Sequence, residues 1–143
     1  MPPRVQSVSA APAQNAAPAA NGQRLDFVFV HDRQLSPNGA EMVAKIVKAL
    51  GKTPETAPVV LERPFPAAKI YIVLGGLAMR KFFPEIKGAP GKWAKAKTGE
   101  EVLITYSPEY ILRFVEVTPA VQKMKEDMWR SLKTAMQRTR LYA

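Results

Sequence analysis

The stretch "AKIYIVLGG", residues 68–76, is the most apolar segment of this 143-residue chain and indicates the fold class. A proline-rich segment precedes it, and two glycines close it. A continuous apolar run of this length, bounded by proline and glycine, is typical of a central parallel strand that is buried on both faces. Because parallel strands need crossover connections, helices are expected before and after it.

Strand-like and helix-like patterns alternate on both sides of this segment. The other strand-like stretches are "LDFVFVHD" (25–32), "APVVLE" (57–62) and "EVLITY" (101–106). The helix-like stretches are 35–52, which ends at a glycine, 76–85, and 118–142, which opens with a Thr-Pro N-cap pair. The basic segment "IKGAPGKWAKAKTGEE" (86–101) is interpreted as a loop. This alternation predicts an α/β fold with a small, mostly parallel, four-stranded sheet.

The two ends of the chain differ in composition. Residues 1–24 are mainly Ala, Pro, Gln, Asn and Ser, with almost nothing to bury, which predicts a disordered Ala/Pro-rich tail. An organelle transit peptide, or a tether that orders on a partner through Val5 and Val8, are the alternatives. Residues 25–143 are long enough for one sizeable core and are predicted to form a single domain.

Composition excludes several classes of protein. The chain has no cysteine, which excludes disulfides, cysteine-ligated metals and a cysteine nucleophile. We expect no cofactor and no metal. No apolar run approaches the roughly 20 residues of a membrane span, and we expect a soluble, cytoplasmic protein with no membrane partner. The net charge of +9 favours a polyanionic partner such as DNA, although many basic proteins are merely soluble.

Candidate cleft residues follow the predicted strands. Gly75 and Gly76 stand at a strand-to-helix junction, where they permit a tight turn or an anion at the helix N-terminus. His31 and Asp32 end the first predicted strand at the same edge, where open parallel sheets bind ligands. Neighbours along a strand point to opposite faces, so a ready-made His-Asp pair is not expected.

Lysines and a tryptophan alternate in the basic segment. Lys92, Lys95 and Lys97 flank Trp93 and are candidates for phosphate contacts, with the indole either stacking on a base or anchoring the loop. The Met and Trp stripe of the last helix is interpreted as core packing, and a Met-rich groove for a partner is the alternative.

Three motifs together resemble the uracil-DNA glycosylase superfamily, in particular its thermophile-type branch. They are "KIYIVLGGLAMRKFF", "PGKW" and "VLITYSPEYILR", in that order along the chain. The resemblance implies a three-layer α/β/α domain, and it adds Ser107 and Arg113 to the candidate DNA-binding residues. It also places Ser107 in the cleft with His31, Asp32, Gly75 and Gly76.

Two departures from that family decide the expected activity. Where the family has a histidine that stabilises the leaving base, this chain has Ser107, and the glycine-rich acid loop after the first strand is reduced to "FVHDRQLSPNG". Asp32 is the only surviving candidate for activating water. The resemblance therefore implies a catalytically degenerate domain, and the alternative is an active glycosylase with a rearranged site that uses Asp32.

A second resemblance is to the psi subunit family of the bacterial DNA polymerase III clamp-loader assembly. It rests on the N-terminal segment, on the helix ending in "KALGKTPE", and on "SPEYILRFVEVTPAVQKMKEDMW". That family is glycosylase-like in fold and lacks the activity. The resemblance implies a DNA- or protein-binding module in replication or repair, with DNA or clamp-loader subunits as partners.

Overall fold

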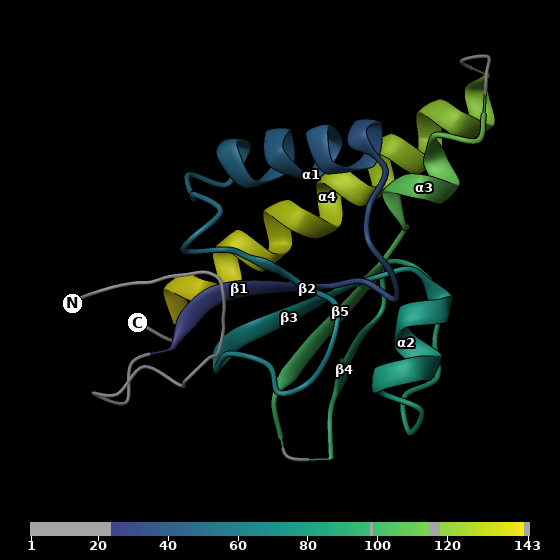
Figure 1. Ribbon diagram of the computed structural model, residues 1–143. Helices are drawn as coiled ribbons and strands as arrows, with labels where there is room; N and C mark the ends of the chain where they lie inside the picture. Colours follow the sequence, from purple (N-terminus) through teal and green to yellow (C-terminus); the bar gives the residue numbers. More distant parts are fainter. Residues whose placement is uncertain (1–23, 98, 115–117, 142–143) are drawn as a thin grey trace.

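The computed structural model describes residues 24–97, 99–114 and 118–141 (Figure 1). Within these ranges the strands form one five-stranded sheet with the order β2-β1-β3-β5-β4. Their bounds are β1 Leu25–Val30, β2 Val59–Val60, β3 Ala68–Leu74, β4 Trp93–Lys95 and β5 Glu101–Thr105. The pairs that join β2, β1, β3 and β5 are parallel, and β4 is antiparallel to β5. The predicted α/β class is confirmed.

Helices lie on both faces of this sheet. Their bounds are α1 Pro37–Ala49, α2 Gly76–Phe82, α3 Pro108–Ile111 and α4 Pro119–Leu141. Helices α1 and α4 run across one face, and α2 lies on the other side at the end where the strands point (Figure 1).

Strand β3 is central, and its side chains reach both faces. Ile70, Ile72 and Leu74 join the core beneath α1 and α4, whereas Tyr71 and Val73 join the core beneath α2. All five are buried. The alternation of side chains along a strand explains this division, and the prediction of a strand buried on both faces is confirmed.

The expected count of four strands was wrong, because β4 lies within the segment predicted to be a loop. Trp93 pairs with Leu103 and Lys95 pairs with Glu101. A tight turn that includes Gly99, with φ of 94°, connects the two strands. Strand β4 has only three residues, and two of them, Ala94 and Lys95, have a low strand preference. Its pairing with β5 is therefore what defines it as a strand.

Capping residues set the ends of the long helices. The Ser36 hydroxyl accepts a hydrogen bond from the Gly39 amide at the start of α1, and Gly51 follows its end with φ of 75°. The Thr118 hydroxyl accepts from the Val121 amide at the start of α4, as the Thr-Pro signal predicts. Met128 and Leu132 of α4 are buried in the core, which confirms the packing role of its apolar stripe.

The predicted tail lies outside the described residues, apart from Arg24. None of the helices in the described ranges combines the length and the apolar character that a membrane span requires.

Candidate functional site

Three parallel strands bring their carboxyl ends to one edge of the sheet. Val30 at the end of β1 pairs with Val73 of β3, and Leu74 pairs with Thr105 at the end of β5. The residues that follow these strands must therefore lie side by side, although they are far apart in the sequence. This edge is the usual ligand position in open parallel sheets.

The imidazole of His31 meets the hydroxyl of Ser107 at this edge. His31 Nε2 lies 2.9 Å from Ser107 Oγ, and Nδ1 lies 2.6 Å from the carbonyl oxygen of Arg33. A carbonyl oxygen only accepts, so Nδ1 carries the proton and Nε2 accepts from the serine hydroxyl. The Arg33 amide nitrogen also lies 3.4 Å from Nδ1, but an Nδ1 that carries the proton has no lone pair to accept from it. The side chain of His31 is fully buried, and both of its nitrogens are used inside the protein.

Ser107 also caps α3 and packs against Gly75. Its hydroxyl oxygen accepts a hydrogen bond from the Glu109 amide at 3.2 Å. A Cβ on Gly75 would lie 2.9 Å from the Cβ of Ser107, closer than real Cβ atoms approach, and Gly75 has φ of 98°. Gly75 therefore allows the segments that follow β3 and β5 to lie in close contact, and its positive φ belongs to the turn between β3 and α2. Gly76 is the first residue of α2.

Asp32 lies near His31 but is engaged elsewhere. Its Oδ2 accepts from Arg33 Nη1 at 2.6 Å, and its Oδ1 is 3.7 Å from His31 Nε2, beyond hydrogen-bond range. The expectation that strand alternation separates the two side chains does not apply, because β1 ends at Val30 and both residues follow it, with Asp32 in a bend. The Asp32 side chain is only 16% exposed.

A carboxylate that the sequence did not single out lies at the start of α1. Glu109 Oε2 accepts a hydrogen bond from the Ser36 amide at 2.7 Å. The first turn of α1 has no acidic residue of its own, so Glu109 supplies the negative charge that a helix N-terminus favours. Gly39 makes room for it, since a Cβ there would collide with the same carboxylate. The sequence shows that Glu109 follows the N-cap residue Ser107 by two positions. It does not show that the Glu109 carboxylate binds the Ser36 amide, which is 73 residues away.

The last residue of β5 holds a hydroxyl without a partner. Thr105 is buried, and its Oγ1 makes no hydrogen bond within the described part of the chain. An unpaired buried hydroxyl destabilises a fold by about 1–3 kcal/mol.

The predicted DNA-binding residues are spread along the sheet rather than gathered. Lys95 pairs with Glu101, the first residue of β5, and Lys97 lies further out in the turn, so both are at the amino end of β5. The Lys92 carbonyl accepts from the Ile104 amide, which places Lys92 nearer the carboxyl end. Ser107 and Arg113 follow β5. Lys95 and Ser107 are separated by roughly 20 Å of strand.

Trp93 is an anchor of the sheet edge. Its ring packs against the core beneath α1 and α4, and the guanidinium of Arg138 lies 3.8 Å from the ring centroid. Arg138 also donates to Glu101 Oε1 at 2.6 Å. One face of the indole is thus covered by the chain itself, which favours the anchoring interpretation over base stacking.

Exposed apolar side chains follow the same carboxyl edge. Tyr106 and Tyr110 stack with their ring planes 8° apart, and Phe114 meets Tyr110 edge to face at 5.4 Å between centroids. Tyr110, Leu112 and Phe114 are each 41–44% exposed, and Leu77 in the first turn of α2 is 54% exposed. The sequence did not reveal this aromatic group, because Tyr106 and Phe114 lie on either side of the four-residue helix α3 and meet Tyr110 only in the folded chain.

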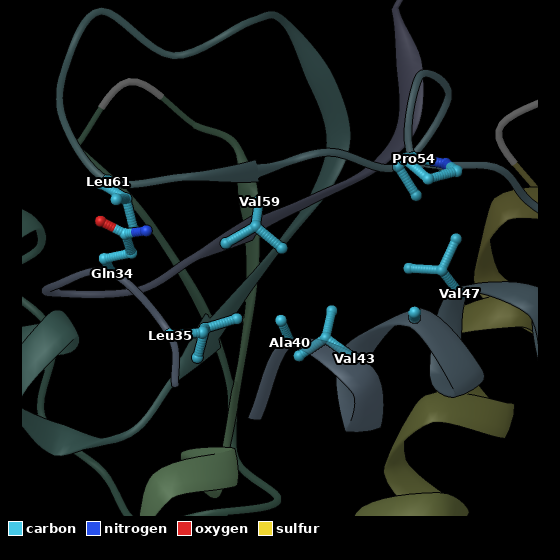
Figure 2. A pocket seen from close by; sticks show the side chains of 10 residues that line it. Gln34, Leu35, Ala40, Val43, Val47, Pro54, Val59 and Leu61 are labelled. Carbon is cyan, nitrogen blue, oxygen red and sulfur yellow. The ribbon is translucent and has the colours of Figure 1, made fainter. Parts of the chain in front are cut away.

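A separate apolar pocket lies between α1 and the β2 edge of the sheet. Its volume is about 330 Å³, and Val43, Val47 and Val59 point into it from the two elements (Figure 2). Gln34 is the polar side chain on its rim. None of the predicted site residues lines it.

The described residues contain no group of three or more His, Asp or Glu side chains that could hold a metal ion. A scan against protein-family models and a search of curated proteins both gave no significant match to this chain.

Proposed function

We propose that this chain is a catalytically degenerate uracil-DNA glycosylase-like domain, with the three-layer α/β/α arrangement of that superfamily, that serves as a DNA- or protein-binding module in replication or repair. The proposal rests on the motif order around Ser107 and on one observation, the hydrogen bond between His31 and Ser107.

That hydrogen bond bears on catalysis because it pairs the His31 imidazole with the Ser107 hydroxyl, and base excision would need a donor that is free to bind the leaving base. The resemblance gives the position of Ser107 to a histidine that donates to the anionic base. Here the chain's imidazole comes from His31, is fully buried, and donates instead to the Arg33 carbonyl. One well-placed donor to a developing anion contributes about 10²–10³ in rate. A buried ring that already has two partners does not provide it.

The two carboxylates near this edge are also hydrogen-bonded within the chain, although the Thr105 hydroxyl has no partner among the described residues. The Asp32 carboxylate accepts from the Arg33 guanidinium, and the Glu109 carboxylate accepts from the Ser36 amide. A general base must have a lone pair within reach of its water. These hydrogen bonds indicate that the two carboxylates stabilise a loop and the start of a helix, rather than bind a substrate.

A uracil-release assay tests the absence of catalysis. Purified full-length chain is incubated with single-stranded and double-stranded DNA containing uracil, beside an active glycosylase as positive control and the Asp32→Asn variant. We expect no release above the uncatalysed background from either form of this chain. Release by the parent chain that Asp32→Asn abolishes would refute the proposal and establish the alternative, a rearranged active site.

The resemblance to the psi family makes clamp-loader subunits candidate partners within this proposal, and the net charge of +9 makes DNA the other candidate. The salt dependence of binding distinguishes DNA from a protein partner. If Lys92, Lys95, Lys97 and Arg113 bind phosphates, affinity for DNA falls steeply between low and moderate salt.

A further inference from the structure

We propose that the exposed side chains of and after α3 form a protein-docking surface, and that its partner presents apolar side chains beside acidic ones. This surface, called the α3 surface, consists of Tyr110, Leu112, Arg113 and Phe114. Tyr106, which precedes α3 and is half-buried, supports it through its contact with Tyr110. The inference rests on the proposed binding function and names its surface and partner class.

The α3 surface holds three of the four large apolar side chains that are strongly exposed in the described ranges. Two of these side chains are held by ring contacts: Tyr110 stacks on Tyr106, and Tyr110 and Phe114 meet edge to face. Aromatic side chains that are already held in place lose little conformational freedom on binding, which makes them effective anchors. Scattered exposed apolar residues need no explanation, but a contiguous group does.

The composition of the α3 surface distinguishes a protein partner from a nucleic acid. Residues 101–114 contain no lysine and one arginine, while lysines occur at 87, 92, 95 and 97 and along α4. Interface cores are enriched in Tyr, Phe and Arg and depleted in Lys. A nucleic-acid surface needs cations at the spacing of phosphates, and the α3 surface offers only Arg113.

Arg113 indicates the charge of the partner. Its side chain is exposed, and its guanidinium makes no hydrogen bond or ion pair with another described residue. It lies between Leu112 and Phe114 in the sequence, and all three residues are exposed, so a partner that covers these apolar groups comes close to Arg113. An acidic side chain on the partner would satisfy it, and the chain's net charge of +9 attracts an acidic surface.

Selection of binders from a phage-displayed library of random peptides tests whether the α3 surface binds a protein partner. The library is selected on the full-length chain, and dissociation constants of the selected peptides are then measured for the parent, for Tyr110→Ala/Phe114→Ala, for Arg113→Glu, and for Lys45→Glu. The last variant is the matched control, because it makes the same change of charge as Arg113→Glu at an exposed side chain of α1 that belongs to none of the candidate sites. Arg113→Glu keeps the test valid if the aromatic double variant folds poorly.

We expect peptides that combine acidic and large apolar residues, with affinity reduced about tenfold or more by both α3-surface variants and unchanged in the lysine control. Selection of no peptide, or of peptides that bind all variants equally, would overturn the inference. So would either alternative occupant: oligothymidylate that binds the parent but not Tyr110→Ala/Phe114→Ala, or a dimer in sedimentation that the same variant dissociates. None of these outcomes depends on uracil release, so failure here is distinguishable from failure of the proposed function.

Discussion

Replacing Gly75 by alanine probes the contact that closes the carboxyl edge of the sheet. Gly75 has φ of 98° and ψ of 162°, a region of backbone conformation open essentially to glycine alone. A Cβ at this position would also lie 2.9 Å from the Cβ of Ser107. Gly99 provides the matched control, because it has a similar φ of 94° and no atom within 4 Å of an added Cβ.

The expected magnitudes follow from these two differences. Backbone strain destabilises either alanine variant by about 1–3 kcal/mol, and reduced freedom of the unfolded chain returns about 0.4–1 kcal/mol in both. Only Gly75→Ala adds the crowding against Ser107, an overpacking term of about 1–3 kcal/mol. We therefore expect Gly75→Ala to unfold about 2 kcal/mol more easily than Gly99→Ala, which corresponds to a gap in Tm of roughly 8 °C.

Urea denaturation followed by circular dichroism measures the difference. Both variants should keep the slope of the parent and shift the midpoint, the Gly75 variant further. Adding Ser107→Gly to Gly75→Ala removes the opposing Cβ, so the two substitutions should be coupled favourably by about 1 kcal/mol or more in a double-mutant cycle. Equal destabilisation of the two alanine variants, with no coupling to Ser107→Gly, would refute the close packing of β3 and β5 at this edge.

Two further predictions concern stability. Thr105→Val should stabilise the protein by about 1 kcal/mol in the same urea assay, because it replaces an unpaired buried hydroxyl by a group of similar shape. Thr139→Val should destabilise it by a similar amount, since that hydroxyl donates to a helix carbonyl at 2.7 Å; the opposite order would contradict the assignment. Asp26 is partly desolvated, which opposes ionisation, but hydrogen bonds and charges from Lys52 and Lys69 outweigh this and lower its pKa. Its stabilising contribution is therefore complete above the unfolded-state pKa near 3.9 and is lost as pH falls through the lower folded-state pKa. Asp26→Asn should flatten that part of the acid-denaturation curve, and an unchanged curve would show that the ion pairs contribute nothing.

Local pattern predicted most of the fold. The apolar run of β3, the N-cap of α4 and the glycine after α1 are features of a few consecutive residues, and each was placed correctly. Strand β4 was missed because three residues carry too little local preference, and its pairing with β5 is what makes it a strand.

The contacts of the candidate site could not be predicted from the sequence. The end of a predicted strand assigned His31 and Gly75 to the carboxyl edge of the sheet, and the family resemblance added Ser107 to them. That His31 binds Ser107, and that Glu109 caps α1, was not predicted, since these pairs are 76 and 73 residues apart. No local rule connects such residues.

Apart from β4, the sequence by itself thus determined where the strands of the sheet and the long helices lie, because backbone preference and burial of one face are decided within a few turns of chain. Only the tertiary structure decided what the lone histidine does. The register of β1, β3 and β5 brings His31 against Ser107 and leaves the aromatic side chains of α3 exposed. Register is a property of paired strands, so it becomes fixed only when distant segments of the chain meet.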